Sequence, residues 1–173
     1  MHSLLRQSVL LSGLALGAAF IGQNASASAD DNVRWQSVIG IVQANNVVGS
    51  GTGAVTGGGT PWSTLDGHAD ADLRSGKINF DVHGLVLAGG NTIGTPGTIV
   101  QVKGTLVCDT DGSASGGNTV LVDTPLVDLD DQGNARFNGR IGPLPSVCAT
   151  EPDIAFLVRV GAGRWIANGT VLR

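Results

Sequence analysis

The chain has 173 residues, of which 42% are hydrophobic and 14% are charged, and its net charge is −4 at pH 7. This apolar fraction is too high for an intrinsically disordered chain, and the charges lie singly, without the clustered Lys and Arg side chains that bind nucleic-acid phosphates. The 27 glycines follow no collagen period, so they indicate many turns and loops instead.

The N-terminal segment has the three parts of a secretory signal. Arg6 precedes an apolar run that ends at Gly22, and two overlapping A-x-A cleavage sites end at Ala27 and Ala29. The alternative is an uncleaved anchor helix, but the apolar run is short for a hydrocarbon core about 30 Å thick. We therefore predict that residues 1–29 are a cleavable signal peptide and that the protein is secreted or periplasmic, with no membrane span after cleavage.

The rest of the chain, residues 30–173, is predicted to form a single all-β domain. No stretch shows a capped helical period, and apolar residues alternate in short runs separated by Gly, Asp, Asn and Pro. A first strand is expected over 33–43. The glycine-rich segment 45–62 indicates a loop or a weak edge strand.

A β-hairpin is predicted over residues 65–87, with its turn at Ser75-Gly76. Opposing Arg74 to Lys77 sets the register of the two strands. One face then carries small and apolar residues and is expected to face the core. Its members are Leu65, Gly67, Ala69, Ala71, Leu73, Ile78, Phe80, Val82, Gly84 and Val86.

The other face of this hairpin is polar and acidic. The register places His68 opposite His83 and Asp70 opposite Asp81, with the Cβ atoms of opposed residues about 5 Å apart. Two imidazoles with a carboxylate are a common ligand set for divalent zinc, copper or iron, and a cation would remove the repulsion between the aspartates. These four residues are the candidate metal ligands. The alternative is a solvated face whose aspartates are neutralised by nearby Lys or Arg side chains.

Further strands are expected near 99–108, 119–129 and 135–141 and in a hairpin that turns at Ala162-Gly163. The middle pair is expected to form a hairpin with Asp128 opposite Arg136, and the last hairpin to pair Val158 with Ala167 and Val160 with Trp165. About eight or nine strands, mostly joined by hairpins, predict an antiparallel β-sandwich of immunoglobulin-like or jelly-roll type. A closed β-barrel is the alternative fold.

The chain has two cysteines. Cys108 ends a predicted strand and is expected to face the core, and Cys148 lies in a proline-flanked loop. Cysteines of an exported domain are expected to pair, so we predict a disulfide between them. Two free buried thiols are the alternative.

Two loops, 109–113 and 128–134, combine Asp with Gly and Ser or Asn in the manner of calcium sites. Neither has the spacing of an EF-hand loop, which requires Gly at position 6 and Glu at position 12. Turns need the same residue types, so turn formation is the competing interpretation of both loops.

Tyrosine is absent from the chain, so a sugar-binding or base-stacking platform would depend on the three tryptophans. Trp35 and Trp165 lie in predicted strands and are expected in the core. Trp62 follows a proline in a glycine-rich loop and is expected to be exposed, where it could contact a ligand.

The motifs of common enzymes are missing. There is no nucleophile elbow, no H-E-x-x-H, no Walker loop and no dinucleotide-binding glycine motif. Asp70 and Asp81 could face each other as in a glycosidase, but without flanking aromatic subsites. We therefore predict a non-catalytic exported domain with a structural, adhesive or interaction role at the cell surface or in the periplasm, whose partner is a protein or a surface polymer.

Two alternative functions follow from the same sequence. The first is a divalent-metal-binding or metal-dependent protein that uses the polar face of the 65–87 hairpin. The second is a β-barrel that binds a small ligand in its interior.

Overall fold

The computed structural model describes residues 31–150 and 153–171, so the predicted signal peptide lies outside the described residues. The described chain is nearly all β, as predicted, and its strand pairs are antiparallel. The strands are β1 (Asn32–Gly40), β2 (Val47–Val48), β3 (Val55–Thr56), β4 (Trp62–Ser63), β5 (Asp66–Asp72), β6 (Lys77–His83), β7 (Val86–Leu87), β8 (Gln101–Cys108), β9 (Val120–Asp123), β10 (Val127–Asp128), β11 (Ala135–Arg140), β12 (Ile154–Val160) and β13 (Trp165–Val171). A 3₁₀ turn, η1 (Gly51–Gly53), and a short helix, α1 (Val147–Thr150), complete the described elements. Within the described ranges, no helix has the length and apolar character needed to cross a membrane.

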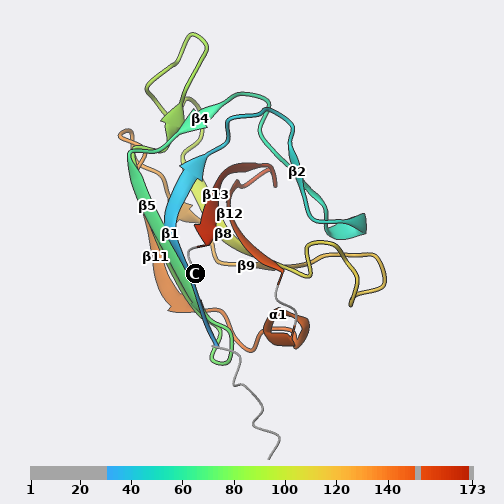
Figure 1. Ribbon diagram of the computed structural model, residues 1–173. Coiled ribbons are helices and arrows are strands. Elements are labelled where there is room, and N and C mark those ends of the chain that lie inside the picture. The colour runs from blue at the N-terminus through green and yellow to red at the C-terminus, as the bar shows by residue number, and fades with distance from the viewer. Residues whose placement is uncertain (1–30, 151–152, 172–173) are drawn as a thin grey trace, which may run out of the picture.

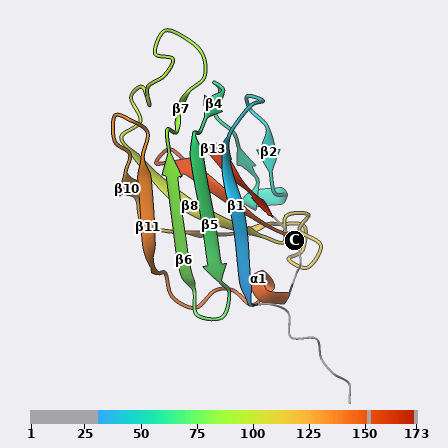
Figure 2. The same ribbon diagram turned by 60° about the vertical axis from the view of Figure 1, so that its left-hand side comes forward.

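Most of the strands form one curled sheet, an open half-barrel (Figure 1). Its order is β10-β8-β12-β13-β1-β5-β6-β11. Strand β9 pairs with the C-terminal part of β8, from Thr105 to Cys108. Figure 2 shows β1, β5, β6 and β11 side by side as one wall, with the strands around β8 crossing behind it. Strands β10 and β11 are the two ends of this order, and they lie close together without forming a ladder in the described part of the chain. We call the gap between β10 and β11 the seam.

Strands β5 and β6 form the predicted hairpin, but the predicted register is wrong by two residues. His68 lies opposite Asp81, and His83 lies opposite Asp66. Because side chains alternate between the two faces with a period of two, a slip of two residues keeps each side chain on its predicted face. The predicted core face is therefore largely buried, although Leu65 at its end is 88% exposed.

The difference in register comes from a wider turn than predicted. The Asp72 side chain accepts hydrogen bonds from the backbone N–H groups of Arg74 and Ser75, at 3.0 and 2.9 Å. Gly76 has φ +68°, which a residue without a Cβ adopts at no steric cost. Arg74 thus belongs to the turn, and Asp72 is the residue that pairs with Lys77.

The predicted hairpin between 119–129 and 135–141 is also wrong. Strand β11 pairs with β6, which places Arg136 opposite Asp81, and β10 pairs with β8, which places Asp128 opposite Gln101. The loop between β10 and β11 joins the two ends of the curled sheet, so each strand takes its ladder partner from a different side of the half-barrel. The same loop, residues 129–134, connects β10 to β11 and so closes one end of the seam.

The final hairpin follows the prediction at Val158, which pairs with Ala167. Nearer the turn, Trp165 pairs with Arg159 instead of Val160, because the register shifts between Val158 and Arg159. Bulges of this kind add one unpaired residue and increase the local twist of a strand. They leave the hairpin itself intact.

Aromatic rings fill the centre of the half-barrel. The Phe156 ring lies 5.5 Å from Trp35 and 5.7 Å from Phe80, measured between ring centroids, and Phe80 stacks on Phe137 at 6.2 Å. Trp35, Phe80 and Phe156 are completely buried. The core thus extends from β1 through β6 to β12.

Trp62 is buried, contrary to the prediction that it is exposed. Its side chain is 6% exposed, because β4 pairs with β7 and places Trp62 opposite Leu87. The other two tryptophans, Trp35 and Trp165, are buried as predicted. Val100, which precedes β8, is 69% exposed.

Cys108 and Cys148 are joined by a disulfide, with their Cα atoms 4.9 Å apart. The bond links the end of β8 to α1, and both side chains are buried. The chain between the two cysteines contains the seam and strands β9 to β11. The disulfide therefore closes a covalent loop that contains β10, β11 and the connection between these two ends of the curled sheet.

Candidate functional site

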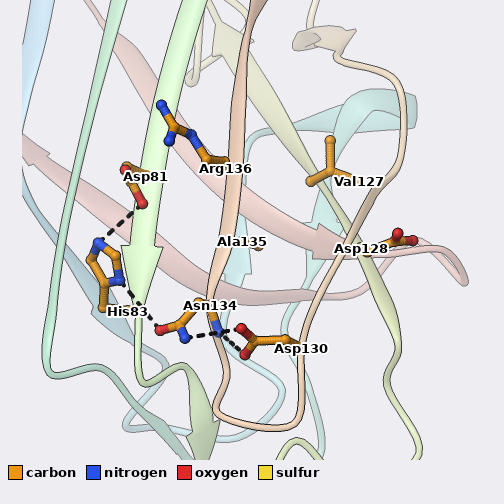
Figure 3. Close-up of a pocket in the computed structure, with 8 residues that line it drawn as sticks. All are labelled: Asp81, His83, Val127, Asp128, Asp130, Asn134, Ala135 and Arg136. Atoms are coloured by element: carbon orange, nitrogen blue, oxygen red, sulfur yellow. Dashed lines mark hydrogen bonds and ion pairs between the residues drawn. The ribbon is translucent and has the colours of Figure 1, made fainter.

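The seam forms an open groove of about 430 Å³ (Figure 3). Most of the side chains that line it are polar or charged, and they come from β6, β10, β11 and the loop between the last two. They are Asp81, His83, Val127, Asp128, Asp130, Asn134, Ala135 and Arg136. The groove exists because β10 and β11 approach each other without the hydrogen bonds that would close the barrel.

A chain of polar contacts crosses one end of the groove. The Nε2 atom of His83 lies 3.2 Å from Oδ1 of Asp81, and the Nδ1 atom lies 3.3 Å from Oδ1 of Asn134 (Figure 3). The Asn134 amide nitrogen donates to Oδ2 of Asp130 at 3.0 Å, and the Gly84 N–H points to Oδ1 of Asn134 at 3.3 Å. These contacts tie β6 to the loop on the other side of the seam.

The hydrogen bonds of Asn134 determine which of its side-chain atoms faces the His83 ring. Because the amide nitrogen donates to Asp130 and the amide oxygen accepts from Gly84, the His83 ring faces an acceptor oxygen on both of its nitrogens. Only the doubly protonated imidazolium can donate to both oxygens. A ring that carries one proton donates to Asp81 or to Asn134, so in either tautomer His83 forms a hydrogen bond within the lining of the groove.

Asp130 has a structural role in the loop at the closed end of the seam. Hydrogen bonds from the backbone and the side chain of Asn134 hold the pKa of Asp130 below its ordinary value. Its Oδ1 atom also accepts the N–H of Gln132 at 3.0 Å. Both oxygens of Asp130 are therefore engaged within the loop, and turn formation accounts for the 128–134 sequence without a calcium ion.

The four residues predicted to bind a metal do not meet as expected. Neither His68 and His83 nor Asp70 and Asp81 lie opposite each other, because the hairpin has a different register. Asp70 lies opposite Arg34 and accepts a hydrogen bond from Asn79 at 3.0 Å.

Asp81 of the same set lies opposite Arg136. Each of the two aspartates thus faces a cationic side chain. In the described ranges, the four residues do not form a group of metal-ligating atoms. A metal site on this hairpin stays a prediction. The pairing of His68 with His83, on which the prediction was based, is absent from the register of the hairpin.

A second charged cluster lies on β8, β9 and β12, and no sequence pattern pointed to it. Asp123 forms ion pairs with Lys103 and Arg159, and it accepts the hydroxyl of Thr105 at 2.7 Å. Burial raises the pKa of Asp123, but the hydrogen bonds from Lys103 and Thr105 and the charge of Arg159 outweigh it, so the pKa lies below its ordinary value. These contacts join three neighbouring strands, and they stabilise the sheet at neutral pH.

Comparison of the chain with protein-family models, with curated proteins and with solved structures found no match.

Proposed function

We propose that the protein is an exported, non-catalytic β-domain with an interaction role, and that the groove at the seam is its binding surface. The observation that carries this proposal is the polar lining of the groove, in which charged side chains lie beside the hydrogen bonds between His83 and Asn134. The groove thus offers charged and hydrogen-bonding side chains at the surface of the domain. Such a surface suits the binding of a partner, which we propose to be a protein or a polymer of the cell surface.

Export is supported by two features of the chain. Both cysteines of the sequence form one disulfide, and bonds of this kind persist in oxidising compartments. The N-terminal 29 residues carry the signal-peptide pattern described above. We therefore propose that the mature domain begins at residue 30 and works outside the cytoplasm.

Site-specific photocrosslinking in cells tests the interaction. A photoreactive residue replaces Asp128, which is exposed in the groove, and in a control protein it replaces Thr92, which is exposed in a loop outside the groove lining. We expect a discrete adduct from position 128 but not from position 92, and we expect Arg136→Glu to abolish it. Adducts from both positions, or from neither, would contradict the proposal.

Cell fractionation tests export. The tagged full-length chain should appear outside the cytoplasm with a mass that corresponds to cleavage after Ala29, and its cysteines should resist thiol labelling until a reductant is added. A chain that starts at residue 30 is the matched control and should stay in the cytoplasm with reactive thiols. Full-length protein in the cytoplasm would refute the export proposal.

A further inference from the structure

Three aspartates meet at the end of β8, on the side of the molecule that carries the disulfide. Asp109 directly follows Cys108, Asp111 lies two residues further along the loop, and Asp153 precedes β12. One carboxylate oxygen from each of the three lies within 4.8 Å of the others. This acidic cluster is separate from the groove at the seam, whose lining shares none of its residues.

The most buried member of the cluster has an oxygen without a partner. Asp109 is completely buried, and its Oδ2 atom accepts the N–H of Ala114 at 3.1 Å. Its Oδ1 atom is buried and has no hydrogen-bond partner among the described residues. An unsatisfied buried carboxylate oxygen is costly, and buried charges in proteins are normally paired with cations or metals. Oδ1 of Asp109 is therefore the oxygen left for a ligand.

The other two carboxylates are oriented by hydrogen bonds to one oxygen each. Oδ1 of Asp111 accepts the N–H of Ser113 at 2.9 Å. Oδ2 of Asp153 accepts the hydroxyl of Thr110 at 3.0 Å and the N–H of Asp111 at 3.2 Å. These bonds hold the carboxylates in place and leave Oδ2 of Asp111 and Oδ1 of Asp153 for a ligand. A set of oxygens held in this way is preorganised for a cation.

None of the ion pairs among the described residues involves Asp109, Asp111 or Asp153. Carboxylates this close repel one another when ionised, and a divalent cation between them removes that repulsion.

We propose that Asp109, Asp111 and Asp153 bind a calcium ion. All the ligand atoms are oxygens, which suit calcium and not the softer zinc or copper. Calcium takes six to eight oxygen ligands in a flexible arrangement, so water molecules complete the shell around the three carboxylates. The ion connects the end of β8 to the start of β12 beside the disulfide, and the proposal holds independently of the proposed partner.

Calorimetric titration of the purified, disulfide-bonded protein after chelator treatment tests the site. We expect one calcium ion with a dissociation constant of about 10⁻⁴–10⁻³ M, the range of extracellular calcium modules, and weaker binding of magnesium. Asp111→Asn and Asp153→Asn should weaken calcium binding at least tenfold. Asp131→Asn removes an exposed charge from the other aspartate-rich loop and is the matched control, which should bind normally.

Three calorimetric results would overturn the proposal: no binding at millimolar calcium, equal weakening by Asp131→Asn, or magnesium binding as tight as calcium binding. Amide chemical shifts measured by NMR should change around Asp109 to Ala114 when calcium is added. Changes confined to the groove at the seam would place the ion elsewhere and overturn the assignment.

A stability measurement separates metal binding from turn formation. Asp111 is exposed, and an Asn at this position can still accept the N–H of Ser113, so Asp111→Asn is expected to fold. With chelator present, the variant should unfold at the same urea concentration as the wild type or at a higher one, because the repulsion is reduced. With calcium present, the variant should unfold at a lower urea concentration than the wild type. An equal decrease under both conditions would show that Asp111 serves only the turn and would refute the proposal.

Discussion

Removal of the disulfide by replacing Cys108 and Cys148 with alanine should strongly destabilise the domain. The bond closes a loop with a sequence separation of 40 residues. On the chain-entropy model a loop of this length raises the entropy of unfolding by about 13 cal/mol/K when the bond is lost, which is about 4 kcal/mol at room temperature. With a urea dependence of about 2 kcal/mol/M, the unfolding midpoint should fall by about 2 M.

Tryptophan fluorescence is the suitable readout, because Trp35, Trp62 and Trp165 are all buried and become exposed to water on unfolding. The reduced wild-type protein is the control, and its midpoint should agree with that of the double alanine variant. If the midpoint of either protein moves by less than about 0.5 M, the loop between the cysteines does not behave as a free chain in the unfolded state, and the entropic argument is refuted.

Three further predictions use the same unfolding assay. Phe156→Ala removes a ring that contacts Phe80 and the rest of the aromatic core, and it should cost about 3–5 kcal/mol; a loss well under this range would mean that the core rearranges to fill the space. Gly104→Ala places a Cβ atom 2.9 Å from two ring atoms of Phe80, which should destabilise the protein by about 1–3 kcal/mol. Gly59→Ala meets no atom within 4 Å and should be neutral. Asp123→Asn should be destabilising at neutral pH, and because the pKa of Asp123 is lowered in the folded state, the difference from the wild type should persist above the ordinary Asp pKa of about 3.9 and disappear as the pH falls through the lower folded-state pKa. A difference that is independent of pH would contradict this assignment of the charge.

Part of the candidate groove could be read from the sequence. The alternation of residues 65–87 correctly places Asp81 and His83 on the polar face of a hairpin. Their contacts with Asn134 across the seam could not be predicted, because they depend on the loop that joins the two ends of the curled sheet. The wrong partner predicted for β11 has the same origin: residues close in sequence need not pair when a sheet curls back on itself.

The acidic cluster shows the same division. The sequence contains the Asp109-Thr110-Asp111 segment, and its resemblance to a calcium loop is visible there. Asp153 could not be added to it, because Thr110 and Asp153 are 43 positions apart and meet only when β12 pairs with β8. The unsatisfied oxygen of Asp109 likewise appears only when burial is known.

The sequence by itself determined the all-β class, most of the strands and the face that each side chain of the β5–β6 hairpin occupies. These features depend on a period of two, and they survive a register error of two residues. Tertiary structure decided the register, the strand order and the burial of Trp62. The first depends on the hydrogen bonds of Asp72 in the turn, and the other two on which distant strands pair as the sheet curls. Contacts between residues far apart in the chain set the strand order and the burial of Trp62, and a local turn sets the register. Alternation along a single strand encodes neither.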